Sequence, residues 1–268
     1  MLRSLYAGVS GMKGFQTKLD VIGNNIANVN TIGYKKSTIN FQDLLSQNLS
    51  GSGVNPTQVG LGSTISSITT QHTPGSSMTT GVGTDLTIMG NGFFVVQSPD
   101  AGLGEGEYLT RAGNFVVDRD GFLVNSQGYN VLDSNGEKIM IDPEVYDSFS
   151  INQSGEIMGK RSDTGVEELV LADDVTIGIA SPPNPAGLRK FGGSLYEMTT
   201  NADPTGTVTI GTVAGMNTDV ASGQLEMSNV DLTEEFTEMI IAQRGFQANS
   251  RTITTSDEIL QEVVNLKR

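Results

Sequence analysis

Apolar residues recur at steps of three or four through residues 1–36, which is the pattern of one face of a helix. The stripe consists of Leu2, Leu5, Val9, Met12, Phe15, Leu19, Ile22, Ile26 and Val29. From Met12 onward it becomes a heptad repeat, with two columns of apolar residues. Gly33 follows the stripe and predicts the left-handed residue that ends a helix. Such a stripe needs a partner that covers it.

A second helix with a matching stripe is predicted at the other end of the chain, over residues 231–268. Asp231 is its expected N-cap, and Glu234 stands where a capping box would place it. A strict interval of seven, with support between its members, gives the apolar positions Leu232, Phe236, Met239, Ala242, Phe246, Ile253, Leu260 and Val263. A helix of about 35 residues would be roughly 50 Å long. That length is more natural in a bundle or tube than on a small domain.

Charge also favours a meeting of the two ends. Residues 1–36 hold five basic side chains against one acidic, and residues 231–268 hold four against seven. Exposed pairs of this kind add little affinity. We therefore predict that residues 1–36 and 226–268 pair as a coiled-coil-like domain. The predicted seam comprises Leu5, Val9, Met12, Phe15, Leu19, Ile22, Asn24, Asn25, Ile26, Asn28, Val29, Leu232, Phe236, Met239, Ala242, Phe246, Ile253 and Leu260.

Glycines and asparagines make the first helix a poor one by propensity. Gly8, Gly11, Gly14 and Gly23 each cost roughly 1 kcal/mol relative to alanine. An ordinary amphipathic core helix is the simpler interpretation of the stripe. The glycines instead favour a packing element that becomes ordered only with its neighbours, because small residues let two backbones approach closely.

The middle of the chain predicts strands. Residues 37–84 are expected to form an extended linker, with a hinge at Gly51, Gly53 and Pro56. Residues 85–225 contain short apolar or alternating runs separated by turns that end in glycine, which is typical of an antiparallel meander. The expected fold class is therefore α+β, with a central all-β domain between paired terminal helices.

Composition excludes several kinds of chemistry. The chain has no cysteine and a single histidine, His72, so thiolate chemistry and cysteine-rich zinc sites are excluded. A net charge of −14 argues against nucleic acid or an anionic membrane as the main partner. No apolar run is long enough for a membrane span, and we expect no cleavable signal. Asp118-x-Asp120-Gly121 lacks the later ligands of a calcium loop. We expect no catalytic, cofactor or metal site.

Three motifs in order carry a family resemblance. Residues 19–28 have the sequence LDVIGNNIAN and are followed by Thr31-x-Gly33-Tyr34-Lys35; residues 110–115 are TRAGNF; residues 225–232 and 239–250 are LEMSNVDL and MIIAQRGFQANS. These closely resemble the signatures of the flagellar hook and rod protein family, and the resemblance extends over essentially the whole chain. Within that family the chain looks most like the short hook proteins of Gram-positive bacteria, with the distal rod proteins second.

The resemblance implies a structural subunit of the bacterial flagellum, outside the cell, exported by the flagellar type III apparatus without a cleaved signal. It implies polymerisation of many copies into a hollow, flexible tube, with the distal rod, hook cap and hook–filament junction proteins as partners. A distal rod subunit is one alternative. A secreted β-domain enzyme or adhesin, merely oligomerised by its helices, is an alternative from another class.

Overall fold

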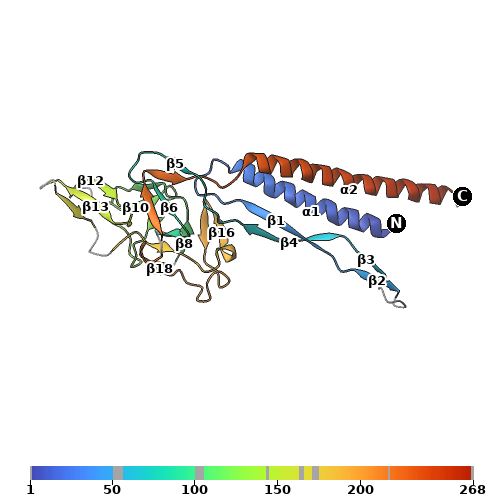
Figure 1. Cartoon of the computed structure of the whole chain (residues 1–268), viewed down its shortest axis with the longest axis horizontal. Coiled ribbons are helices and arrows are strands. Elements are labelled where there is room, and N and C mark those ends of the chain that lie inside the picture. The colour runs from blue at the N-terminus through green and yellow to red at the C-terminus, as the bar shows by residue number, and fades with distance from the viewer. Residues whose placement is uncertain are drawn as a thin grey trace. The chain divides into compact units, whose positions relative to one another are not determined.

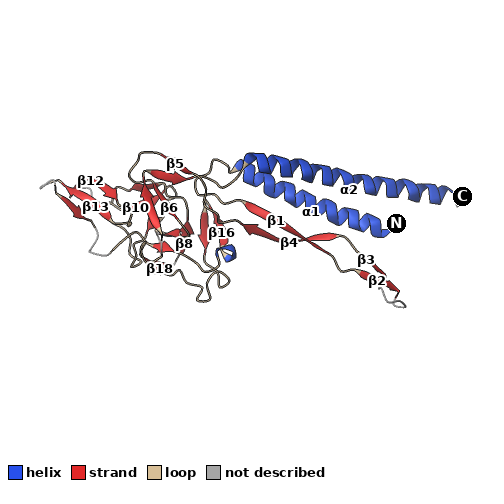
Figure 2. Cartoon of the chain, in the orientation of Figure 1, coloured by secondary structure: helices blue, strands red, loops and turns tan. Residues whose placement is uncertain are grey.

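The computed structural model describes residues 2–50, 57–99, 106–142, 145–162, 166–170, 175–216 and 218–266. The chain divides into two compact units. The helical unit comprises residues 1–29, 36–71 and 230–268, and the β unit comprises residues 30–35 and 72–229. Figure 2 shows the two long helices at the ends of the chain and strands throughout the middle. The expected α+β class, with terminal helices and a central antiparallel domain, is confirmed.

The helical unit contains helix α1 (Leu2–Ala27) and helix α2 (Leu232–Leu266), which lie side by side and antiparallel (Figure 1). Asp231 caps α2 as predicted: its carboxylate accepts a hydrogen bond of 2.8 Å from the Thr233 amide. That bond and one from Glu234 hold the pKa of Asp231 below its usual value. Glu234 does not complete a capping box, because its carboxylate pairs with Lys36 instead, at 2.7 Å.

Two antiparallel strand pairs complete the helical unit. They pair β1 (Ser37–Asp43) with β4 (Ser63–Thr70), and β2 (Gln47–Ser50) with β3 (Thr57–Val59). Residues 37–71 of the expected linker therefore belong to the helical unit, and 22 of them lie in strands. A ring contact explains part of this: Phe41 lies beside Phe15, with centroids 6.0 Å apart. Gly14 of α1 leaves room for the Phe41 ring, which a Cβ there would approach within 2.8 Å.

The β unit contains a nine-stranded antiparallel sheet and smaller sheets around it. Its strands are β5 (Ser77–Thr79), β6 (Leu86–Met89), β7 (Phe93–Gln97), β8 (Glu107–Thr110), β9 (Phe115–Val117), β10 (Leu123–Asn125), β11 (Asn130–Val131), β12 (Tyr146–Ile151), β13 (Ile157–Arg161), β14 (Glu167–Leu169), β15 (Ile179–Ala180), β16 (Arg189–Gly192), β17 (Leu195–Glu197), β18 (Ile210–Gly211), β19 (Asp219–Ser222) and β20 (Gln224–Glu226). The main path runs β16-β17-β8-β7-β11-β10-β9, and β15 joins β7 to β18. Strand β7 is buried along its whole length, so it forms the centre of the core.

Glycine turns organise the β unit as the sequence predicts. Gly121, Gly128, Gly136 and Gly155 all have φ near +80° and donate their amide to the carbonyl three residues earlier. An asparagine or aspartate side chain reinforces two of these turns. The Asp133 carboxylate, for example, accepts amide hydrogen bonds from Asn135 and Glu137. These local reversals allow short strands to pair with their neighbours.

Candidate functional site

Close approach of α1 and α2 is set by glycines on both helices. A Cβ at Gly11 would lie 2.9 Å from the Asn249 amide nitrogen, and a Cβ at Gly245 would lie 2.5 Å from the Phe15 ring. A Cβ at Gly8 would lie 3.2 Å from the Ile253 side chain, closer than ordinary van der Waals contact. The helices therefore touch through small residues, so larger side chains at these positions would push them apart.

The buried column of α2 differs from the apolar heptad that the sequence suggests. Glu235, Ala242 and Ser256 are buried and stand seven or fourteen residues apart. Asn249 has the same spacing and contacts Gly11. Within the described chain, α2 thus presents small and polar residues to α1, and its larger apolar residues lie to either side.

The predicted seam residues divide into three groups by exposure. Ile22, Asn25 and Ala242 are buried; Leu5, Met12, Phe15, Leu19, Ile26, Asn28, Val29, Met239, Ile253 and Leu260 are half-buried; Val9, Asn24, Leu232, Phe236 and Phe246 are exposed. The helix ends at Ala27, so Val29 lies beyond it. The contact between α1 and α2 accounts for only part of the apolar surface that the seam offers.

Asn25 clamps three elements together. Its side-chain amide donates to the Ser37 carbonyl (2.9 Å) and accepts from the Ser37 amide (3.1 Å), which ties α1 to the start of β1. The same amide nitrogen lies 3.2 Å from the Glu235 carboxylate on α2. Burial raises the pKa of Glu235, and the Asn25 bond opposes that rise. The sequence predicts that Asn25 lies in the seam but does not indicate this bridging role.

Ion pairs surround the clamp. Lys18 pairs with Glu238 at 2.5 Å, and Lys36 pairs with Glu234. Together with Asn25 and Glu235 these residues line a cavity of about 220 Å³ within the helical unit. The two lysines come from the basic N-terminal segment and the glutamates from the acidic start of α2, so the charge asymmetry of the sequence is realised as specific pairs.

Large apolar side chains remain exposed on both helices. Each is at least 37 % exposed: Tyr6, Val9, Leu232, Phe236, Ile240, Ile241, Phe246, Ile259, Val263, Val264 and Leu266. Large apolar side chains left exposed together on one element mark an interaction site. A single copy of the chain does not cover it.

The predicted hinge and helix-end residues have different outcomes. Gly51, Gly53 and Pro56 lie outside the described residues. Gly33 has the expected positive φ of +66°, but α1 has already ended at Ala27. A glycine is required at position 33 for a different reason: a Cβ there would lie 2.5 Å from the backbone nitrogen of Ala112 within the β unit.

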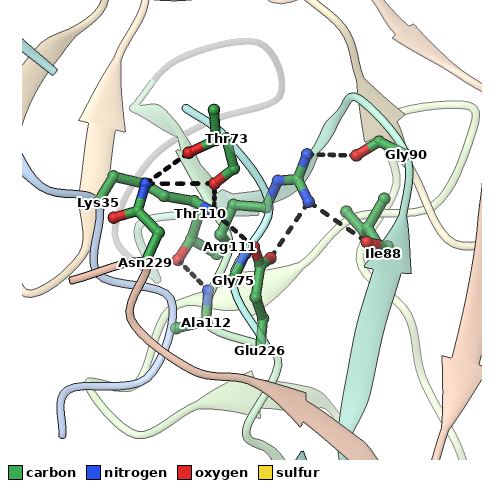
Figure 3. Close-up of polar contacts among 10 residues, drawn as sticks. All are labelled: Lys35, Thr73, Gly75, Ile88, Gly90, Thr110, Arg111, Ala112, Glu226 and Asn229. Carbon is green, nitrogen blue, oxygen red and sulfur yellow. Dashed lines mark hydrogen bonds and ion pairs between the residues drawn. The ribbon is translucent and has the colours of Figure 1, made fainter. Parts of the chain in front are cut away.

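A buried charge cluster in the β unit was not anticipated from the sequence (Figure 3). The Glu226 carboxylate on β20 pairs with Lys35 and, at 3.2 Å, with Arg111. It also accepts a 2.9 Å hydrogen bond from the Gly75 amide. All three charged side chains are no more than 3 % exposed. Burial lowers the pKa of Lys35, and its bond to Glu226 opposes that shift.

Backbone carbonyls complete the cluster. Arg111 donates to the carbonyls of Ile88 (3.3 Å) and Gly90 (2.7 Å), and Lys35 donates to that of Thr73 (2.7 Å). The chain segments near residues 35, 75, 90, 111 and 226 are therefore joined at one point. Charge alone could not have revealed this, because an isolated lysine, arginine or glutamate is usually exposed.

The described residues offer no metal or membrane site. No three acidic or histidine side chains among them converge to hold a metal ion. No described helix combines the length and the apolar character that crossing a membrane requires.

Comparison with known proteins accounts for nearly the whole chain. Family models match residues 5–35 (flagella basal body rod protein), 87–159 (flagellar hook protein FlgE/F/G D1 domain) and 221–266 (flagellar basal body rod FlgEFG protein C-terminal). The flagellar basal-body rod protein FlgG of Bacillus subtilis is 50 % identical over 283 residues, covering all of both chains. The chain belongs to the flagellar rod and hook protein family.

Other members of the family also align with the chain over its full length. The rod protein FlgG of Borreliella burgdorferi is 37 % identical over 285 residues, and the hook protein FlgE of that organism is 31 % identical over 450, each covering all of both chains.

The buried cluster draws one ion from each family segment: Lys35 from the first, Arg111 from the second and Glu226 from the third. In this family member, the cluster therefore links all three.

Proposed function

We propose that the chain is a structural subunit that polymerises through its helical unit into the flagellar hook, a hollow tube that bends while it transmits torque. The observation that carries this proposal is the exposed apolar surface of α1 and α2. Other copies of the chain would cover these side chains, at about 25 cal/mol for each Å² of apolar area removed from water. The predicted seam is then completed between copies as well as within one.

Gly23 supports contact between copies. It lies within α1, four residues before the helix ends, yet it is exposed, and a Cβ there would meet no atom within 4 Å. A helical glycine costs about 1 kcal/mol relative to alanine, and packing within one copy gives nothing in return. A glycine that is costly but not required by its own chain fits a place where another backbone comes close.

The partners follow from the polymer. They are many further copies of the chain, with the distal rod below, the hook cap during growth and the hook–filament junction proteins above. Export through the flagellar type III apparatus, without a cleaved signal, would deliver the subunit outside the cell. The role is structural rather than enzymatic, and no cofactor or metal is required.

A distal rod subunit is the second candidate, favoured by one specific observation. The Bacillus subtilis relative is named a rod protein, and the two chains align over their full lengths at 50 % identity. The alignment with the Borreliella hook protein extends over 450 positions, which leaves long unmatched stretches. The hook candidate has in its favour the resemblance of the chain to the short hook proteins of Gram-positive bacteria.

Deleting the gene separates the two candidates. If the chain forms the hook, electron microscopy of purified basal bodies will show complete rods that bear no hook. Truncated rods would assign the chain to the distal rod. Complete hooks on normal rods would refute both.

A further inference from the structure

An open pocket in the β unit adjoins the buried charge cluster. Its volume is about 290 Å³, and its lining includes His72, Asn91, Phe93, Arg111 and Ser181. His72 contacts the rings of Phe93 and Tyr196 edge-on, at centroid distances of 5.4 and 5.3 Å. One wall of the pocket is therefore aromatic, and the amide of Asn91 and the hydroxyl of Ser181 supply polar groups.

Two residues that line this pocket carry unpaired nitrogen atoms. Both ring nitrogens of His72 and the Nε atom of Arg111 are buried without a hydrogen-bond partner among the described residues. The arginine side chain is 3 % exposed, so bulk water does not satisfy this N–H. The Arg111 Nε–H and one N–H of the neutral His72 ring are donors, and buried donors without partners are rare in folded proteins because each costs about 1–3 kcal/mol. They indicate a place where an acceptor group binds.

The charge around the pocket is positive. The buried cluster holds two cations, Lys35 and Arg111, against the single carboxylate of Glu226. Lys190 adds a third positive charge that acts on the His72 ring. Burial is the largest cause, and these three cations the next, that lower the pKa of His72 to about 4. The Pro185 carbonyl raises this pKa slightly, although it does not meet the geometry of a full hydrogen bond. In a chain of net charge −14, a positive pocket is distinctive.

We propose that this pocket is a carboxylate-binding site, in which the Nε–H of Arg111 and the one N–H of the neutral His72 ring face an anionic acceptor and the excess charge of the cluster is neutralised. A carboxylate fits better than a neutral carbonyl because the cluster lacks one negative charge. It can come from a small molecule in solution or from an acidic side chain of a second copy. The site lies wholly within the β unit, so the proposal does not depend on polymerisation.

His72 makes the test direct, because it is the only histidine in the chain. Full-length monomer labelled in histidine gives one imidazole signal by NMR. At pH 6 we expect sodium acetate to shift that signal in a saturable way, with sodium chloride at equal ionic strength having no such effect. Acetate should also raise the pKa of His72, since a nearby anion favours the charged imidazole. A shift that is linear, or equal in chloride, overturns the proposal.

A pair of isosteric variants supplies the control. Asn91→Asp places a negative charge at the pocket and should weaken acetate binding at least tenfold. Gln153→Glu makes the same charge change at an exposed turn and should leave binding unchanged. Equal acetate affinity in the two variants overturns the proposal.

The polymer then identifies the source of the carboxylate. If a neighbouring copy supplies it, the His72 signal in sedimented polymer will match the acetate-bound monomer and will not respond to acetate. If a free carboxylate is the ligand, the polymer will respond as the monomer does. A polymer signal that matches the acetate-free monomer and does not respond overturns the proposal for the assembled protein.

Discussion

Removing the carboxylate of Glu226 should strongly destabilise the β unit. Glu226→Gln keeps the side-chain volume but leaves Lys35 and Arg111 buried without a counter-ion. Breaking a buried ion pair by removing one partner costs about 3–5 kcal/mol. For a unit of this size, each kcal/mol lowers the melting temperature by about 2–4 °C. We therefore expect a fall of about 6–20 °C.

An exposed ion pair in the same unit provides the matched control. Arg189 pairs with Glu197, and their side chains are 69 % and 36 % exposed. Glu197→Gln should cost no more than about 1 kcal/mol. Thermal unfolding of both variants, followed by near-ultraviolet circular dichroism of the tyrosines, compares them. If Glu226→Gln melts within about 2 °C of Glu197→Gln, the cluster does not hold the unit together.

Four further predictions concern assembly and pH. Phe246→Asp should abolish sedimentable polymer while near-ultraviolet dichroism of the β unit stays unchanged, because it places an unpaired charge in the proposed interface; normal polymer would show that the interface lies elsewhere. Gly23→Ala should stabilise helix α1 in the monomer by about 1 kcal/mol and should slow polymerisation, which light scattering measures. Unimpaired assembly would remove Gly23 from the interface. Asn25→Ala removes the hydrogen bonds of this side chain to the Ser37 backbone and to Glu235 and should cost about 0.5–1.5 kcal/mol for each bond lost, measured by urea unfolding; a loss below 1 kcal/mol would show that the clamp is dispensable. Because the unfolded state binds a proton at His72 below pH 6.5 and the folded state only near pH 4, stability should fall as pH drops through that window; His72→Phe should flatten this part of the profile, and identical profiles would refute the assignment.

The helices and the β unit were predictable because their signals are local. Heptad spacing and the Asp231 cap place α2, and turns such as the one at Gly121 divide the strands. The β1–β4 strand pair was not predicted as such, because its pairing joins residues such as Ser37 and Thr70, far apart in the sequence. Weak alternation within a polar segment does not specify its partner strand.

The face of α2 that contacts α1 was also beyond the sequence. Large apolar residues such as Phe246 suggest a seam, whereas the structure buries Ala242 and Ser256 within one copy. A heptad pattern does not say whether its partner is the same chain or another copy. A polymer subunit has apolar contacts within the chain and apolar contacts between copies, so the apolar pattern of its sequence includes the residues of both.

Other copies of the chain are proposed to cover the apolar surface left exposed on the helices. The chain has no cysteine, so a single engineered thiol reports on one position. Ile241 is 52 % exposed on α2, and Ile241→Cys should react readily with a maleimide in the monomer. In sedimented polymer seen as tubes by electron microscopy, we expect that reactivity to fall at least tenfold, while Asp120→Cys shows that the reagent reaches the β unit. Equal reactivity of Ile241→Cys in monomer and polymer, or a chain that remains monomeric with polymer seeds present, would contradict the account.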